Sequence, residues 1–287
     1  MNHLEDLLSS LLVLAWMVEA RDPYTGGHLW RVSRMSQALA ENVGLGEAQV
    51  ARVAIGGFLH DLGKIGVPDA ILRKPDRLND EEYEVIKTHP EVGLRVLSGH
   101  PLLALVRRAV LSHHETPDGR GYPHALKGPD IPTDAAIVGI CDAFDAMTSH
   151  RPYRKGMPTP KAFSIIEANL GSQFHQDLGR RFLELGRRGI FDHIVGHSDV
   201  GIPLLECPLC GPTLAIRRER VSGEHVYCRN CTSEFLLTRE EERFGVIPTM
   251  KQGSARDLEP EPDTELIRRL IEESAQRVAF PELLSAP

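Results

Sequence analysis

Several features that mark common protein classes are scarce or missing in this sequence of 287 residues. Its five cysteines are too few for a secreted disulfide scaffold, which favours a reducing cytoplasm. A formal charge of −7 provides no general basic face, so nucleic acid is not an expected partner. The apolar run at residues 7–18 follows acidic residues and is shorter than the ~20 residues of a membrane span. We therefore expect a buried helix there, and neither a signal peptide nor a membrane anchor.

Helical periodicity dominates the first two thirds of the chain, and no alternating strand pattern occurs before about residue 200. Apolar residues recur at steps of three and four after His28, until Gly44 closes that segment. Asn79 followed by Glu82 predicts a capping box at the start of another helix. We expect helices at about residues 28–43, 47–62, 79–89, 102–114 and 132–150.

Five histidines and two aspartates fall on the inward faces, or at the ends, of these predicted helices. They are His28, His60, Asp61, His89, His113, His114 and Asp142. Any one of these histidines alone is more often a hydrogen-bonded core residue than a metal ligand. Together with the carboxylates they suit a site for two divalent metals of the Fe or Mn type, with one carboxylate bridging. A structural zinc site would favour four ligands that are mostly cysteine.

Five stretches of this sequence, in this order and spacing, resemble the motifs of the HD-GYP family, the bacterial cyclic di-GMP phosphodiesterases of the HD superfamily. They are EARDPYTGGHLWRV, LHDLGKIGVPDAIL, KTHPEVG, HHETPDGRGYP and CDAFDAMTSHRPYR, and the resemblance as a whole covers about residues 19–182. The resemblance implies an all-α HD-type helical bundle, and it matches all seven histidines and aspartates to the family's metal ligands.

The same resemblance implies catalytic roles at the centre of the site. Lys64 matches the lysine of the HDxGK motif, and we expect it to act beside His60 and Asp61. Its ammonium would stabilise charge on the phosphoryl oxygens or help to protonate the leaving ribose oxygen.

Substrate-binding residues follow from the resemblance as well. Gly121, Tyr122 and Pro123 match the segment that names the family, in a loop near the substrate. Arg151 and Arg154 match positions that contact the phosphates and guanine of the dinucleotide. A guanidinium suits such contacts better than an ammonium, although solvated surface charge is the alternative for both arginines.

Two departures from the family pattern have consequences. Members with a third metal carry a glutamate where this chain has Tyr24, so we expect two metals. The family's GxxFDP segment corresponds here to Gly171 and then Phe174, His175 and Gln176, so an aspartate is lost from a loop that holds no metal ligand.

The function implied by the resemblance is metal-dependent hydrolysis of cyclic di-GMP to linear pGpG through a metal-bridging hydroxide. Further cleavage to GMP is left open. One alternative is an HD-superfamily hydrolase of another cyclic dinucleotide or phosphorylated nucleotide. Another is a slow or non-catalytic cyclic di-GMP sensor that signals through the C-terminal region.

Two C-x2-C pairs follow the helical region. Cys207, Cys210, Cys228 and Cys231 have the spacing of a four-cysteine zinc ribbon, and short alternating stretches between and after them predict strands. Disulfides or a redox motif fit this doubled pattern less well. The fifth cysteine, Cys141, is expected to be inert core.

The ribbon could serve as a folding staple, or as a surface that docks a protein partner or a second copy of the chain. Nucleic-acid contact is a weaker alternative. It would use the ribbon's arginines, Arg217, Arg218, Arg220 and Arg229.

We thus expect a helical phosphodiesterase domain at residues 1–195, a linker at 196–206 and a small β-rich zinc ribbon at 207–240. A second, flexible linker is expected at 241–263, where Pro, Glu and Asp are frequent. Residues 264–287 are expected to form an amphipathic helix and tail, whose apolar side would dock on the domain or pair with a partner. That side comprises Leu266, Ile267, Leu270, Ile271 and Val278.

Overall fold

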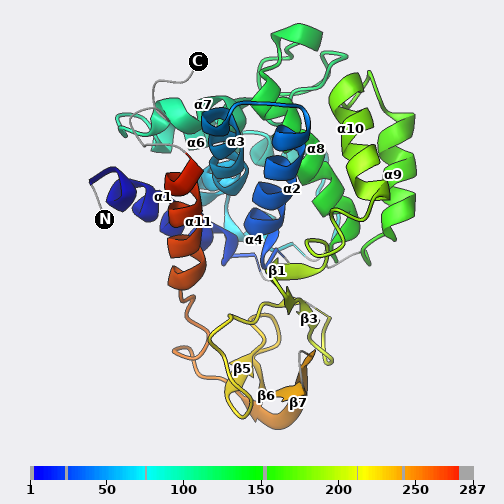
Figure 1. Cartoon of the computed structure of the whole chain (residues 1–287). Coiled ribbons are helices and arrows are strands. Elements are labelled where there is room, and N and C mark those ends of the chain that lie inside the picture. Colours follow the sequence, from blue (N-terminus) through cyan, green and yellow to red (C-terminus); the bar gives the residue numbers. More distant parts are fainter. Residues whose placement is uncertain are drawn as a thin grey trace.

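The computed structural model describes residues 3–22, 25–74, 76–150, 154–211, 213–240 and 243–277. A helical body takes up the first two thirds of the chain, and a small β-rich module lies below it (Figure 1). The predicted helical bundle with a small C-terminal β-rich module is therefore confirmed. Within the described residues, none of the helices combines the length and apolarity needed to cross a bilayer.

Among the described residues, the body consists of α-helices and two short 3-10 helices. The α-helices are α1 (His3–Glu19), α2 (His28–Asn42), α3 (Glu47–Leu59), α4 (Asp69–Leu72), α5 (Asp80–Ile86), α6 (His89–Val96), α7 (Leu103–Ser112), α8 (Thr133–Thr148), α9 (Thr159–Ala168) and α10 (Gln176–Arg187). The 3-10 helices are η1 (Leu62–Gly66) and η2 (Gly128–Asp130). The expected capping box is present, because Asn79 accepts a hydrogen bond from the backbone of Glu82.

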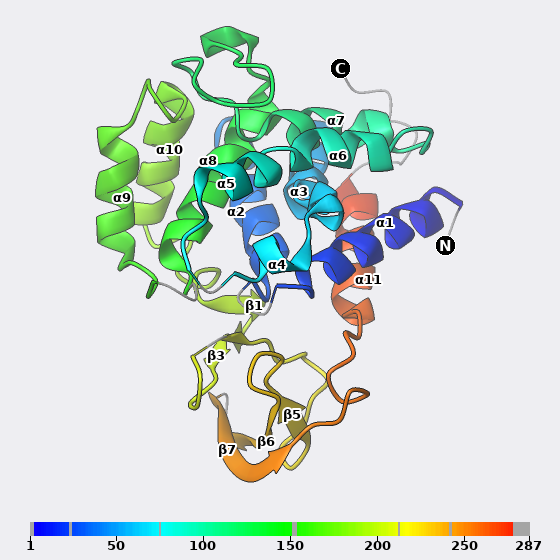
Figure 2. The ribbon, with the colours of Figure 1, turned by 180° about the vertical axis from the view of Figure 1, so that it is seen from behind.

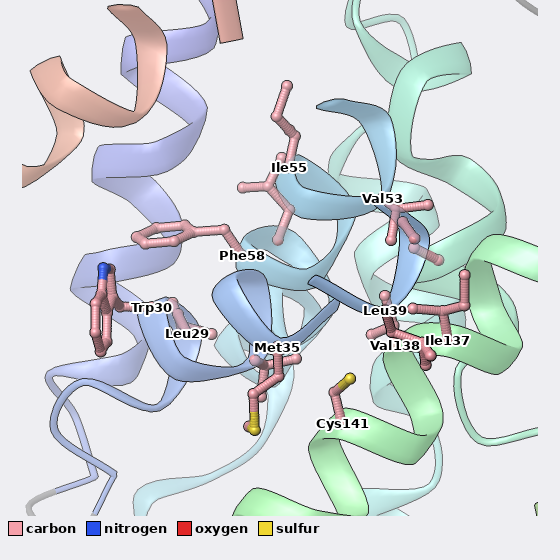
Figure 3. Packing of buried hydrophobic residues seen from close by; sticks show 14 of the residues in the cluster. Leu29, Trp30, Met35, Leu39, Val53, Ile55, Phe58, Ile137, Val138 and Cys141 are labelled. Atoms are coloured by element: carbon pink, nitrogen blue, oxygen red, sulfur yellow. The ribbon is translucent and has the colours of Figure 1, made fainter. Parts of the chain in front are cut away.

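Helix α2 is central to the body because it packs against α3, α8 and α10. Its apolar stripe includes Met35 and Leu39, which lie against side chains of α3 and α8 (Figure 3). Cys141 of α8 is fully buried in the same core, in agreement with the inert role expected for it. Because α2, α3 and α8 pack directly on one another, residues at their ends are held in a fixed relation.

The β-rich module contains short antiparallel strands. They are β1 (His197–Asp199), β2 (Ile202–Pro203), β3 (Leu205–Glu206), β4 (Thr213–Leu214), β5 (His225–Tyr227), β6 (Ser233–Glu240) and β7 (Arg243–Gln252). Strand β1 pairs with β2, β3 pairs with β4, and β5, β6 and β7 form one sheet in that order. Phe235 and Leu237 of β6 and Phe244 of β7 belong to a small core of its own.

Strand β7 lies within residues 241–263, which the sequence predicts to be a flexible linker. Phe244 and Val246 alternate toward the small core, and Pro248 is tolerated because β7 is an edge strand, which needs fewer backbone donors. The strands β1 to β3 likewise fall in the expected linker at 196–206. The proposed domain boundaries themselves stay a prediction.

Helix α11 (Thr264–Arg277) returns from the β-rich module and packs on α1 and α3 (Figures 1 and 2). Leu266, Ile267, Leu270 and Ile271 are buried in the core of the body, and Asp263 caps the helix by accepting a hydrogen bond from the amide of Leu266. Of the two roles left open for this segment, the structure shows docking on its own body. Val278 lies outside the described residues.

Candidate functional site

All seven predicted metal ligands come together in the body. His28 and His89 begin α2 and α6, His60 and Asp61 lie between α3 and η1, His113 and His114 follow α7, and Asp142 lies on α8. Their donor atoms form three overlapping groups, in each of which the atoms lie within 4.8 Å of one another. These groups are His28 with His60 and Asp142, His60 with Asp61 and His113, and His89 with His113 and His114.

Two glycines allow the segments that carry these ligands to approach one another. A Cβ on Gly63 of η1 would lie 1.8 Å from the carbonyl oxygen of His89. A Cβ on Gly139 of α8 would lie 2.4 Å from the carbonyl oxygen of His113. Both distances are far below van der Waals contact, so the convergence of η1 with α6, and of α8 with the end of α7, requires glycine.

Three of the imidazoles have one ring nitrogen fixed by a backbone carbonyl. Nδ1 of His60 lies 2.7 Å from the oxygen of Gly57, Nδ1 of His89 lies 2.8 Å from that of Ile86, and Nδ1 of His113 lies 2.9 Å from that of Ala109. A carbonyl only accepts, so each Nδ1 carries a hydrogen, and Nε2 is the ring nitrogen left to face the other donor groups. This arrangement presents metal-binding nitrogens to the centre.

The donor atoms fit a bound cation. Nε2 of His60 is buried and has no hydrogen-bond partner among the described residues. The Nε2 atoms of His89 and His113 lie 3.2 Å apart, although both keep their lone pairs. Two buried lone pairs that face each other are costly, and a metal ion bound by both nitrogens satisfies them together.

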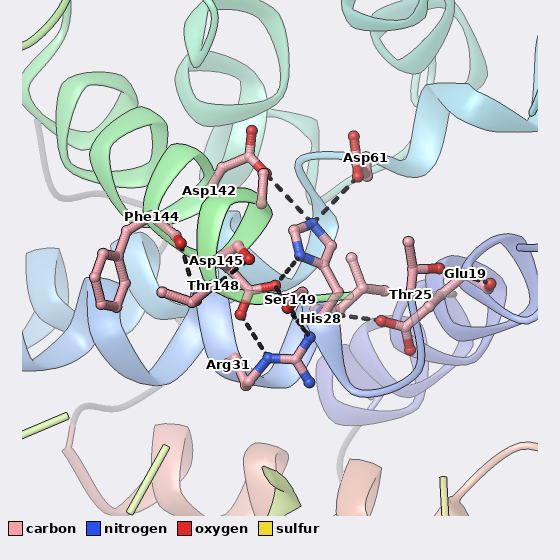
Figure 4. Close-up of polar contacts among 12 residues, drawn as sticks. Glu19, Thr25, His28, Arg31, Asp61, Asp142, Phe144, Asp145, Thr148 and Ser149 are labelled. Atoms are coloured by element: carbon pink, nitrogen blue, oxygen red, sulfur yellow. Dashed lines mark hydrogen bonds and ion pairs between the residues drawn. The ribbon is translucent and has the colours of Figure 1, made fainter. Parts of the chain in front are cut away.

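His28 and the carboxylates carry the charge of the site. Nε2 of His28 lies 3.4 Å from Asp61 and 3.5 Å from Asp142, while its Nδ1 lies 2.8 Å from Asp145 (Figure 4). Burial would lower the pKa of His28, but its hydrogen bonds to Asp145 and Asp61 raise it. Burial would also lower the pKa of His60. The carboxylates of Asp61 and Asp142 outweigh this effect and raise this pKa to about 10. These carboxylates therefore stabilise positive charge at the centre of the site.

The other three imidazoles are neutral at physiological pH. Burial lowers the pKa of His89 to about 4 and that of His114 to about 3. Burial also holds the pKa of His113 well below its usual value. Neutral imidazole is the form that binds a metal ion, so this half of the site needs no loss of a proton before binding.

Lys64 lies at the edge of the cluster. Its Nζ is 2.6 Å from Oδ2 of Asp61. Burial would raise the pKa of Asp61, but the Lys64 ammonium and the His60 ring together hold it well below its usual value. The carboxylate of Asp61 is thus anionic and oriented by the ammonium.

The geometry of this site agrees with comparisons to known proteins. The sequence profile of the HD domain family matches residues 12–178. The chain belongs to the HD domain family. This result, with the relatives named below, confirms the resemblance drawn from the five motifs.

Three curated relatives of this chain are named as phosphodiesterases of cyclic dinucleotides. A cyclic di-GMP phosphodiesterase of Thermotoga maritima is 42% identical over 184 residues, which are 63% of this chain and 50% of that protein. The cyclic di-GMP phosphodiesterase response regulator RpfG of Xanthomonas campestris pv. campestris is 38% identical, over 61% of this chain and 47% of its own. A 3'3'-cGAMP-specific phosphodiesterase 2 of Vibrio cholerae is 36% identical, over 60% and 33%. The chain thus spans half or less of the length of these relatives.

The segment Gly121–Tyr122–Pro123 lies against the cluster of histidines and aspartates. The ring of Tyr122 stacks on that of His114, with centroids 4.6 Å apart and an interplanar angle of 26°. The buried carboxylate of Glu115 holds the following loop, because it accepts hydrogen bonds from the amides of His124 (2.7 Å) and Leu126 (2.9 Å). A Cβ on Gly121 would lie 2.4 Å from the amide nitrogen of Thr116, so the tight return of this loop depends on glycine.

Of the two arginines predicted to bind substrate, only Arg154 lies within the described residues. The guanidinium of Arg154 donates to the carbonyls of Met147 (2.8 Å) and Ala146 (2.6 Å) at the end of α8. Arg151 lies outside the described residues, as does Tyr24. Contact of Arg151 and Arg154 with substrate therefore stays a prediction.

The four ribbon cysteines also converge. Sγ of Cys210 lies 3.6 Å from that of Cys207 and 3.5 Å from that of Cys228, and Cys207 lies 3.7 Å from Cys231. Disulfide bonds would need about 2.05 Å. Sulfurs bound tetrahedrally at roughly 2.3 Å from a zinc ion would lie ~3.8 Å apart, so this group fits a four-thiolate metal site.

Sequence reasoning missed two charged residues behind the cluster. Asp145 is 1% exposed and Arg31 is 1% exposed, and they form a buried ion pair next to His28 (Figure 4). A signal was present, because each residue follows a predicted ligand by three positions and so shares its inward helical face.

Proposed function

We propose that the HD domain of this chain is a metal-dependent phosphodiesterase that hydrolyses cyclic di-GMP to linear pGpG. The observation that carries this proposal is the buried Nε2 of His60, which makes no hydrogen bond among the described residues. It lies 3.4 Å from Asp61 and 3.8 Å from Asp142, inside the overlapping groups of histidine and aspartate donor atoms. The names of two of the relatives above, which are cyclic di-GMP phosphodiesterases, support the choice of substrate.

Two divalent ions, Fe or Mn, suit the nitrogen and oxygen donors of this centre. Asp61 lies between the two ends of the cluster and is the proposed bridging ligand. His28, His60 and Asp142 would complete one ion's set, and His89, His113 and His114 the other's. When bound, such ions lower the pKa of a water molecule and neutralise charge on phosphoryl oxygens.

The residues of the chain orient the reaction. The oxygen of water bonds to one phosphorus, the bond from phosphorus to the ribose O3′ breaks, and O3′ leaves with a proton. Lys64 holds Asp61 in place and would stabilise the phosphoryl charge or supply that proton. Tyr122, Gly121 and Pro123 would line the substrate cleft beside His114, and Arg151 and Arg154 would bind phosphate or guanine. A second round on pGpG would give GMP.

For the β-rich module we propose one zinc ion held by its four cysteines and a role in docking a protein partner or a second copy of the chain. Reduced cysteines at this spacing are consistent with a cytoplasmic protein.

The proposal is tested with protein purified without oxygen, analysed for metal, and incubated with cyclic di-GMP in the presence of Fe(II) or Mn(II). Chromatography should show pGpG as the product. His60→Ala and Asp61→Ala should abolish hydrolysis, whereas His193→Ala, which alters an exposed imidazole, should not. Hydrolysis of 3'3'-cGAMP in preference to cyclic di-GMP would contradict the substrate choice. Wild-type rates in the His60 variant would contradict the site.

A further inference from the structure

The buried ion pair between Arg31 and Asp145 lies one helical turn from two proposed metal ligands. Arg31 follows His28 by three residues on α2, and Asp145 follows Asp142 by three residues on α8. The pair therefore joins the two helices directly beside the point where each of them presents a ligand (Figure 4).

The ion pair is bidentate, and its carboxylate also contacts His28, one of the proposed metal ligands. Nε of Arg31 lies 2.5 Å from Oδ1 of Asp145, and its Nη2 lies 3.0 Å from Oδ2. The same Oδ2 lies 2.8 Å from Nδ1 of His28. Because the ionised carboxylate accepts from both groups, the hydrogen of His28 is placed on Nδ1, and Nε2 faces Asp61 and Asp142.

The remaining nitrogen of the guanidinium reaches a different part of the chain. Nη1 of Arg31 donates to the carbonyl oxygens of Gly26 (3.0 Å) and His197 (2.9 Å). His197 begins β1, the first strand after the helical body. Gly27, with φ +74°, packs so closely on Ser198 that an added Cβ would lie 2.6 Å from its Cα. The Arg31 guanidinium thus holds together the turn before His28 and the start of β1.

Strand β1 is in turn anchored by a buried carboxylate. Asp199 is 3% exposed and accepts hydrogen bonds from Arg218, which follows β4, and from Arg269 of α11. A continuous series of contacts therefore runs from the β-rich module through Asp199 and His197 to Arg31, and from there through Asp145 to His28.

We propose that Arg31 is a positioning residue for the metal centre, which sets His28 against Asp142 and ties this geometry to the chain segment that leads into the four-cysteine module. This inference rests on the metal centre of the proposed function. Packing alone does not account for the pair, since an apolar pair of similar volume usually stabilises a protein interior at least as well. Lysine cannot replace the planar guanidinium of Arg31, because a single ammonium group cannot contact both carboxylate oxygens and two carbonyl oxygens at fixed angles.

The first experiment measures metal binding in the full chain, apart from hydrolysis. Arg31→Lys and Asp145→Asn are compared with wild type by metal content, by titration with Mn(II), and by the visible absorption spectrum of the Co(II) form. Arg34→Lys is the matched control, because Arg34 lies three residues further along α2 and pairs with Glu273 of α11, away from the ligands. We expect at least a tenfold loss of affinity for one ion and an altered Co(II) spectrum in both test variants, and neither change in the control.

The outcomes separate this inference from the proposed function. If wild type binds no metal, the metal centre itself is wrong. If wild type binds two ions and folded Arg31→Lys binds them with equal affinity and an identical Co(II) spectrum, the positioning role is wrong. Should a variant not fold, the wild-type chain still decides the matter through the Nε–H resonance of Arg31. That signal should shift when metal is added, and an unchanged signal would refute the proposal.

The connection to β1 is tested with Asp199→Asn, which weakens the anchor of the strand without touching a ligand. We expect a threefold or greater loss of Mn(II) affinity from this change in the wild-type background and a smaller loss when Arg31 is already lysine. Equal losses in the two backgrounds would show that Asp199 and Arg31 act independently, and would refute the connection.

Discussion

The Nε2 atoms of His89 and His113 lie 3.2 Å apart, and each ring has given its other nitrogen to a backbone carbonyl. Neither Nε2 carries a hydrogen, so the two lone pairs oppose each other in the protein interior. These lone pairs repel each other, and a bound cation would remove the repulsion. Stability should depend on metal for this reason.

Metal addition should raise the thermal midpoint of the protein. Mn(II) at about 1,000 times its Kd should contribute ~4 kcal/mol, or roughly 10 °C. Mn(II) is chosen because thiolates bind it poorly, so the four-cysteine module should not respond. Differential scanning calorimetry checks the shift, and His60→Ala should remove most of it. An equal shift in the variant would mean that the ion binds elsewhere.

Lys64→Met should slow hydrolysis without emptying the site. The change removes the ammonium that lies 2.6 Å from Asp61, but no proposed ligand. We expect kcat to fall about 10²-fold or more, while metal content stays at two ions per chain. Steady-state kinetics with metal analysis measures both quantities, and Lys161→Met, on the exposed face of α9, is the control. Loss of metal together with activity would assign Lys64 a structural role instead.

Gly63→Ala should damage both fold and site, since the new Cβ would collide with the backbone of His89. The free energy of unfolding should fall by about 3 kcal/mol, because backbone must move to make room. Urea denaturation measures the loss. Gly46→Ala, at a φ of −66° and with only Gln49 nearby at 3.9 Å, should cost less than about 1 kcal/mol. Similar losses at both positions would show that the contact with His89 is not tight.

Cys228→Ser should release zinc from the β-rich module and make it sensitive to protease. The module's own core is small, so its stability should depend on the four sulfur ligands. Zinc analysis and limited proteolysis should show cleavage between residues 207 and 252 before cleavage in the helices. Cys141→Ala, in the core of the body, should keep zinc. Retention of a full zinc ion by the Cys228 variant would overturn the assignment.

Much of the fold and the site could be predicted because their signals are local. Helical periodicity predicted α2 and α8, and the spacing of the five motifs picked out the histidines and aspartates, from His28 to Asp142, that the structure brings together. What escaped prediction depends on contacts between distant segments. The role of Arg31 requires Asp145 and His197 to be its neighbours, and nothing in the sequence near Arg31 reveals them.

Two further differences have the same origin. Strand β7 looked like a linker because Pro248 and nearby acidic residues are typical of flexible segments, but β6 provides a partner that such a composition does not anticipate. The sequence left two possible positions for α11, on its own body or on a partner. An amphipathic pattern indicates that the apolar face of a helix is covered, but it does not indicate which surface covers it. The apolar surface of α1 and α3 settles this in the structure.

Helix α11 supplies part of the body's core, yet it is synthesised after the entire four-cysteine module. On the ribosome, α1 and α3 must therefore wait with an uncovered apolar surface until Leu266, Ile267, Leu270 and Ile271 emerge. Capture of zinc by the intervening module would shorten the effective tether to this last helix. Metal supply during translation would then influence how quickly the nascent helical body becomes complete.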